Sequence, residues 1–150
     1  MPVTFVLGSK ADVPFTEKIA AMLKDDFGIP SEIIVASAHK VPEKVVTLIE
    51  KLNAATEPMV VMTVVGMSNG LGGVMAGSCV HPVLNCPPFE TLEEYMVDLH
   101  SSLRMPSDVP VMTVLNPKNA AVAAARILGE SDPAVRAKVA ARIAQIKSQY

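Results

Sequence analysis

The first segment with residue types suited to chemistry is Gly8-Ser9-Lys10-Ala11-Asp12. Free backbone N–H groups at the start of a helix, beside a serine hydroxyl and a lysine, suit a phosphate group. The spacing matches neither Gly-x-x-x-x-Gly-Lys-Ser/Thr nor Gly-x-Gly-x-x-Gly, so neither familiar nucleotide-loop motif is present. The alternative is structural: Asp12 caps a helix and Ser9 occupies a turn.

The second segment is Ser37-Ala38-His39-Lys40. An imidazole can carry a proton near neutral pH, and a lysine beside it could hold an anion. The segment therefore predicts general acid–base chemistry next to an anionic ligand. The alternative is that His39 is an ordinary surface residue.

The third segment, Gly66 to Gly73, has four glycines in eight positions. Glycine lets the backbone approach a ligand closely or adopt positive φ. Ser68 and Asn69 could contact a small polar substrate. The alternative is a tight crossover that serves packing alone.

The other reactive residue types are expected to be structural. Cys79 and Cys86 are too few for a disulfide scaffold, and their spacing is not a zinc pattern. Cys86 has no neighbouring cue for thiolate activation, which favours a buried, inert thiol. His81 and His100 are likewise expected to be structural.

Strands and helices must alternate along the chain to position these segments. Apolar, β-branched runs predict the strands, and apolar residues at helical spacing predict the helices. Asp12 with Pro14, Pro42, and Asp132 with Pro133 are expected to begin helices. The predicted strands are Val3–Leu7, Ile33–Ala36, Met59–Val65, Val83–Asn85 and Val109–Leu115, and the predicted helices include 13–27, 42–52, a short one within 66–77, Ala120–Leu128 and a C-terminal helix from 133.

This alternation predicts an α/β fold in which helices cover both faces of a central parallel sheet, a three-layer α/β/α arrangement. In such folds ligands bind beyond the carboxyl ends of the strands. The three segments described above each follow a predicted strand. We therefore expect them to meet at one edge of the sheet and form one site.

Length and composition limit the function classes. The 150 residues, half of them apolar and 19% charged, predict one folded domain over residues 1–150 and exclude a disordered tail. A net charge of −2 does not suit a nucleic-acid partner. Without a signal peptide or an apolar stretch of about 20 residues, we expect a cytoplasmic protein with no membrane partner. Abundant Ala and Met favour a homo-oligomer.

Six short motifs run in order from Gly8 to about Ile127: Gly8-Ser9-x-x-Asp12, Ser37-Ala38-His39-Lys40, Ser68-Asn69-Gly70-Leu71, Cys86-Pro87-Pro88, Ser101-Ser102-Leu103-Arg104-Met105-Pro106-Ser107 and Asn119-Ala120-Ala121. Single motifs of this kind are weak, but six in the right order are specific. Taken together, they resemble the aminoimidazole ribonucleotide carboxylases of purine biosynthesis, the PurE family.

The family has two classes. One is a mutase that moves a carboxylate from the amine to the ring carbon and carries Ser-Ala-His-Arg. The other uses free CO2 and carries Ser-Ala-His-Lys with Ser-Asn-Gly. Three features make this chain similar to the CO2-using class: Lys40, Ser68-Asn69-Gly70 and the segment Ser101–Ser107.

The resemblance implies a flavodoxin-like fold and an octamer with sites shared between subunits. It implies carboxylation of 5-aminoimidazole ribonucleotide with CO2 to 4-carboxy-5-aminoimidazole ribonucleotide, without biotin, ATP, metal or another cofactor. His39 would be the proton carrier. The substrate would be bound by Ser9, Asp12, Ser37, Lys40, Ser68, Asn69 and Gly70, with Asp12 facing the ribose and the last three lining the CO2 pocket.

Three positions depart from the family's usual residues. Ala11 stands where a second serine is usual, Met67 where the CO2-using class often has arginine, and Asp108 where glycine usually follows Met-Pro-Ser. Two alternatives therefore stay open: a mutase acting on the N-carboxylated isomer, and a family member that binds the nucleotide without catalysis.

Overall fold

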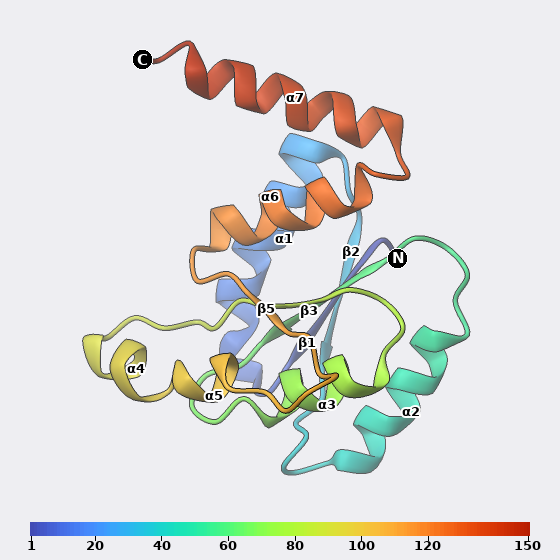
Figure 1. Ribbon diagram of the computed structural model, residues 1–150, viewed down its shortest axis with the longest axis vertical. Coiled ribbons are helices and arrows are strands. Elements are labelled where there is room, and N and C mark those ends of the chain that lie inside the picture. Colours follow the sequence, from blue (N-terminus) through green and yellow to red (C-terminus); the bar gives the residue numbers. More distant parts are fainter.

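The computed structural model describes all 150 residues, and its centre is one all-parallel sheet in the order β2-β1-β3-β4-β5 (Figure 1). The register pairs Leu7 with both Val35 and Val64, so the first three strands end level with one another. The strands are β1 (Val3–Leu7), β2 (Ser31–Val35), β3 (Val60–Val64), β4 (Val83–Asn85) and β5 (Met112–Thr113).

Helices cover both faces of the sheet, which confirms the predicted α/β fold. One face packs against α1 and α6, with α7 against those two helices, and the other face packs against α2 and α3. A single 3-10 turn, η1 (Lys10–Asp12), precedes α1. The α-helices are α1 (Val13–Phe27), α2 (Pro42–Asn53), α3 (Gly70–Ser78), α4 (Leu92–Val97), α5 (His100–Leu103), α6 (Pro117–Leu128) and α7 (Pro133–Lys147).

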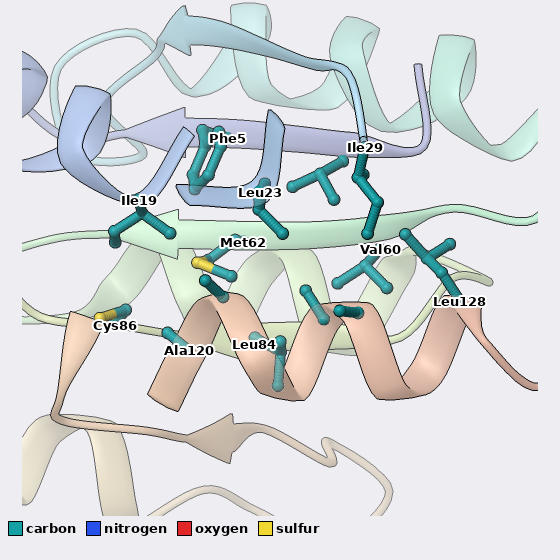
Figure 2. Close-up of a cluster of buried hydrophobic side chains, with 14 of the residues drawn as sticks. Phe5, Ile19, Leu23, Ile29, Val60, Met62, Leu84, Cys86, Ala120 and Leu128 are labelled. Atoms are coloured by element: carbon teal, nitrogen blue, oxygen red, sulfur yellow. The ribbon is translucent and has the colours of Figure 1, made fainter. Parts of the chain in front are cut away.

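Alternation along the strands divides the core into two clusters. Phe5 and Met62 point to one face, where they meet Leu23 of α1 and the alanines of α6 (Figure 2). Val6 and Val61 point to the other face, against α2 and α3. Because both faces are covered, all five residues of β1 and of β3 are buried.

Several predicted helix boundaries are confirmed. Pro42 and Pro133 lie at helix starts, and the Asp132 carboxylate accepts hydrogen bonds from the N–H groups of Ala134 and Val135. Gly28 ends α1 with φ 70°, a left-handed conformation that side chains disfavour. These signals are local, which is why they can be predicted from sequence.

Other expectations are corrected. The Asp12 side chain does not cap α1; instead the Ser9 hydroxyl caps η1 by accepting from Ala11 N–H. The strand predicted over Val109–Leu115 contains only Met112–Thr113. Pro110 has no N–H for the ladder, and Val109 and Val111 instead pack against the cluster beneath α2 and α3.

The sequence interpretation missed α4 and α5. At the end of the sheet where the strands finish, α5 lies beside α3, and α4 lies on the other side of α5 (Figure 1). Their side chains are largely exposed, so they lack the apolar stripe on which the prediction relied. No helix in the chain combines the length and apolar character needed to cross a membrane.

Candidate active site

Three loops leave the sheet together at the carboxyl ends of β1, β2 and β3. Ala36 N–H donates to the Leu7 carbonyl at 2.9 Å, and Gly8 N–H donates to the Val64 carbonyl at 3.2 Å. These bonds extend the ladder one residue beyond β1 and β2. The loops therefore begin side by side at the hydrogen-bonded ends of the strands.

The loops enclose an open cavity of about 500 Å³, within the range typical of small-molecule sites. It brings together six of the eight residues predicted to act on substrate, and it leaves Asn69 and Gly70 outside its wall. The lining residues are Gly8, Ser9, Ala11, Asp12, Ser37, His39, Lys40, Val65, Gly66, Met67 and Ser68.

The first loop offers a hydroxyl and a carboxylate. Ser9 Oγ accepts from Ala11 N–H at 3.2 Å, which leaves the hydroxyl proton free to donate to a ligand. Partial burial raises the pKa of the Asp12 carboxyl, and a backbone hydrogen bond from Ser9 lowers it by less. A carboxylate that is partly desolvated without a cationic partner suits hydroxyl groups of a ligand.

The second loop offers a hydroxyl, an imidazole and an ammonium group. Ser37 is half-buried, and its side chain makes no hydrogen bond within the chain, nor does that of the exposed Lys40. The neighbouring Lys44 is already engaged, since its Nζ donates to the Val35 carbonyl at 2.6 Å. Lys40 is therefore the cation in the cavity wall that remains available to an anion.

The His39 ring lies directly against the start of α3. A Cβ built on Gly70 would fall 2.7 Å from His39 Nε2 and 3.0 Å from Cε1. Contacts this short do not occur at real Cβ atoms, so Gly70 is required by the position of the imidazole. The glycine-rich loop thus places the first turn of α3 against the ring.

Asn69 is held inside the protein and does not face the cavity. It is 4% exposed, its Oδ1 accepts from Gly72 N–H at 2.9 Å, and its Nδ2 donates to Ser102 Oγ at 2.9 Å. A contribution of Asn69 to substrate binding would therefore come from its main chain. Its side chain caps α3.

The remaining reactive residue types lie outside the cavity. Burial raises the pKa of the Cys86 thiol to about 12, which fits the predicted inert core cysteine. His81 Nε2 lies 2.9 Å from the Leu52 carbonyl and serves packing between elements. No group of three His, Cys, Asp or Glu side chains lies close enough together to hold a metal ion.

Comparison with known proteins identifies the family. The family model described as AIR carboxylase matches residues 2–149. The chain belongs to the AIR carboxylase family. This result confirms the resemblance found in the sequence, over almost its whole length.

Individual members of the AIR carboxylase family support the same assignment. The chain is 42% identical over 139 residues to the phosphoribosylaminoimidazole carboxylase of Archaeoglobus fulgidus, covering 93% of this chain and 75% of that protein. It is 40% identical to the human bifunctional phosphoribosylaminoimidazole carboxylase/phosphoribosylaminoimidazole succinocarboxamide synthetase, covering 94% of this chain but 33% of that longer protein. A crystal structure of Treponema denticola PurE superposes with a TM-score of 0.91 at 36% identity, covering 98% of this chain and 92% of that one.

Two of the departures from the family pattern coincide with unusual backbone. Met67 has φ 52° and Asp108 has φ 64°, the only non-glycine residues in the left-handed region. Met67 lies in the cavity wall, and 77% of it is exposed. A left-handed residue persists only where its surroundings hold it, so the loop at Met67 is under constraint.

Asp12→Asn tests the electrostatics of the cavity. Because burial raises the pKa of Asp12, the folded chain binds this proton more tightly than the unfolded chain. The protonated Asp12 carboxyl therefore contributes its full stability below the ordinary pKa of 3.8. That contribution is lost as the pH rises through the raised pKa of Asp12 in the folded chain. We expect the variant to match or exceed the wild type in free energy of unfolding at neutral pH, with the advantage shrinking as pH falls toward 3.8.

Urea denaturation of Asp12→Asn and the wild type at several pH values measures this difference in free energy of unfolding. Glu57→Gln, at an exposed side chain without hydrogen bonds, is the control, and an Asp12→Asn protein less stable at neutral pH contradicts the account.

Gly70→Ala tests the contact between α3 and the imidazole. The added methyl would lie 2.7 Å from His39 Nε2, so the exposed ring is expected to swing away while the fold is retained. NMR of the His39 Cε1–H group measures the displacement. In Gly73→Ala, on the same helix, the methyl meets only the Met105 side chain, with Sδ at 3.4 Å, and the His39 signal should stay in place. An unchanged His39 signal in Gly70→Ala would refute the contact.

Proposed function

We propose that this protein carboxylates 5-aminoimidazole ribonucleotide with CO2, forming 4-carboxy-5-aminoimidazole ribonucleotide in purine biosynthesis. The observation that carries the proposal is the position of His39 and Lys40 in one cavity wall with Ser9, Asp12 and Ser68. Membership of the AIR carboxylase family supports the reaction class. Lys40 and the Ser68-Asn69-Gly70 sequence favour free CO2 over the N-carboxylated isomer as carbon source.

The negative charge of the phosphate determines how the ribonucleotide lies in the cavity. Its phosphate binds at Ser9, Ser37 and Lys40, where two hydroxyl protons and one ammonium group are free to donate. The Asp12 carboxylate would repel the phosphate and accepts hydrogen bonds from the ribose hydroxyls instead. This orientation directs the aminoimidazole ring toward His39 and Ser68, with the main chain of Asn69 and Gly70 beyond.

The reaction follows from the electron-rich ring. The enamine-like carbon uses its π electrons to form the C–C bond to CO2, whose oxygens take the negative charge. That ring carbon then carries both hydrogen and carboxylate. His39 accepts the proton, the C–H electron pair returns to the ring, and aromaticity is restored. Backbone N–H groups of the glycine-rich loop stabilise the carboxylate as its charge forms.

Assembly and location complete the proposal. We infer a homo-octamer in the cytoplasm, and sedimentation of the purified protein measures the assembly. The support is the apolar surface left on α4 and α5, where Leu92, Met96, Val97 and Leu103 are more than half exposed. An apolar patch of this kind suits contact with another copy.

The direct test of the reaction supplies aminoimidazole ribonucleotide with dissolved CO2, and in parallel the N-carboxylated isomer alone. We expect product from the first mixture at a rate that rises with CO2. Product from the isomer alone would make the protein a mutase. Product from neither would make it a nucleotide-binding family member without catalysis.

The role of His39 is tested by His39→Asn, which keeps a polar side chain but cannot accept the proton. We expect kcat to fall at least about 100-fold, because a positioned general base contributes at least that factor. His100→Asn, an exposed histidine outside the cavity, is the matched control and should retain activity. Normal turnover by His39→Asn would remove His39 from the mechanism.

A further inference from the structure

A cluster of buried polar side chains lies behind the start of α3. Asn69 is 4% exposed and Ser102 is 2% exposed, and both belong to the few polar residues among the buried ones. Asn69 Nδ2 donates to Ser102 Oγ at 2.9 Å, across 33 residues of sequence. Buried polar groups must be paired in this way, because an unpaired one destabilises the fold.

Ser101 makes a second connection between α5 and the same residue. Its Oγ accepts from the Asn69 backbone N–H at 2.9 Å. The one hydroxyl proton of Ser101 has two acceptors within reach, the Asp98 carbonyl at 2.9 Å and the Met67 carbonyl at 3.2 Å. Two consecutive serines therefore hold both the main chain and the side chain of Asn69.

The held residue connects α5 to the imidazole. Asn69 immediately precedes Gly70, whose Cα faces His39 Nε2, and its Oδ1 caps the first turn of α3. Two residues earlier, Met67 adopts φ 52°, a conformation that its surroundings must maintain. Loss of the serine hydroxyls would release this loop on the side that meets His39.

We propose that Ser101 and Ser102 are positioning residues: through Asn69 they hold the glycine-rich loop where it sets the His39 ring against the reacting carbon. The inference rests on the proposed carboxylation. Neither serine lines the cavity, so neither contacts substrate in this scheme.

The geometry separates the reaction step from binding. The phosphate and ribose are assigned to the loops after β1 and β2, and no hydrogen bond joins α5 to either loop. Ser101 and Ser102 act only on the loop after β3. Their loss should therefore lower kcat and leave KM for the ribonucleotide nearly unchanged, the pattern of an interaction used in the transition state.

The experiment compares Ser101→Ala and Ser102→Ala with the wild type. We expect kcat to fall at least about tenfold in each, as misplacement of a catalytic group by a fraction of an ångström does. KM should change by less than about twofold. Thr113→Val is the matched control: Thr113 Oγ1 donates to the Ser102 carbonyl at 3.1 Å, so this variant also removes a hydrogen bond to α5 without touching Asn69. It should keep the wild-type kcat.

Ser101→Thr provides the rescue. Ser101 is only half-buried and can accept the extra methyl group, and the threonine hydroxyl restores the bonds to Asn69. Recovery of kcat in Ser101→Thr supports the proposal even where Ser102→Ala fails to fold. An unchanged kcat in folded Ser101→Ala, an equal loss in Thr113→Val, or a rise in KM in place of the fall in kcat overturns it.

A readout that does not need turnover separates this proposal from the proposed function. NMR of the His39 Cε1–H group should shift in Ser101→Ala and stay in place in Thr113→Val. If the wild type carboxylates no substrate, the proposed function fails, and the shift still decides whether the serines position the ring. An unmoved His39 signal overturns the positioning role.

Discussion

The level, parallel ending of β1, β2 and β3 is the constraint on which the site depends. Leu7 pairs with Val35 on one side and with Val64 on the other, so three loops leave the sheet at one line. Because helices cover both faces, the packing of individual side chains holds this register: Phe5 and Met62 pack in one cluster, and Val6 and Val61 pack in the other. Ser9, His39 and Ser68, far apart in the sequence, become neighbours in one cavity for this reason.

Beyond the level strand ends, small residues determine how closely the loops approach one another. The missing Cβ of Gly70 admits the His39 ring, and the buried Asn69 holds the turn in front of it. Ser37 and Lys40, which are expected to meet the ribonucleotide, make no side-chain hydrogen bond within the chain, whereas Asn69 uses its side chain within the fold. The site therefore combines free polar groups at the cavity with paired ones behind it.

Much of this arrangement could be predicted from sequence. Val3–Leu7 and Val83–Asn85 were predicted with the observed bounds, and Gly28 ends α1 as expected. The short β5 could not be predicted from its apolar run alone, because Val109 and Val111 are partly buried by packing rather than by sheet pairing. A local signal for α4 was present: Thr91 and Glu94 form a capping box.

The contacts of the two α5 serines could not be predicted from local sequence patterns. Ser101 and Ser102 meet Asn69 across 32 and 33 residues, and nothing in the spacing of the two segments indicates this contact. Asn69 likewise looked like a substrate ligand because it stands in a glycine-rich loop, yet the fold turns its amide inward. Sequence located the loops of the site, and tertiary contacts decided which side chains face the cavity.

The most decisive measurement is a crystal structure with 4-carboxy-5-aminoimidazole ribonucleotide bound. We expect the phosphate at Ser9, Ser37 and Lys40, with a His39 ring nitrogen about 3–3.5 Å from the carboxylated ring carbon. A ribonucleotide bound elsewhere, for example in the cavity between α6 and α7 near Arg126 and Arg136, would contradict it. So would a His39 ring that faces away from the reacting carbon.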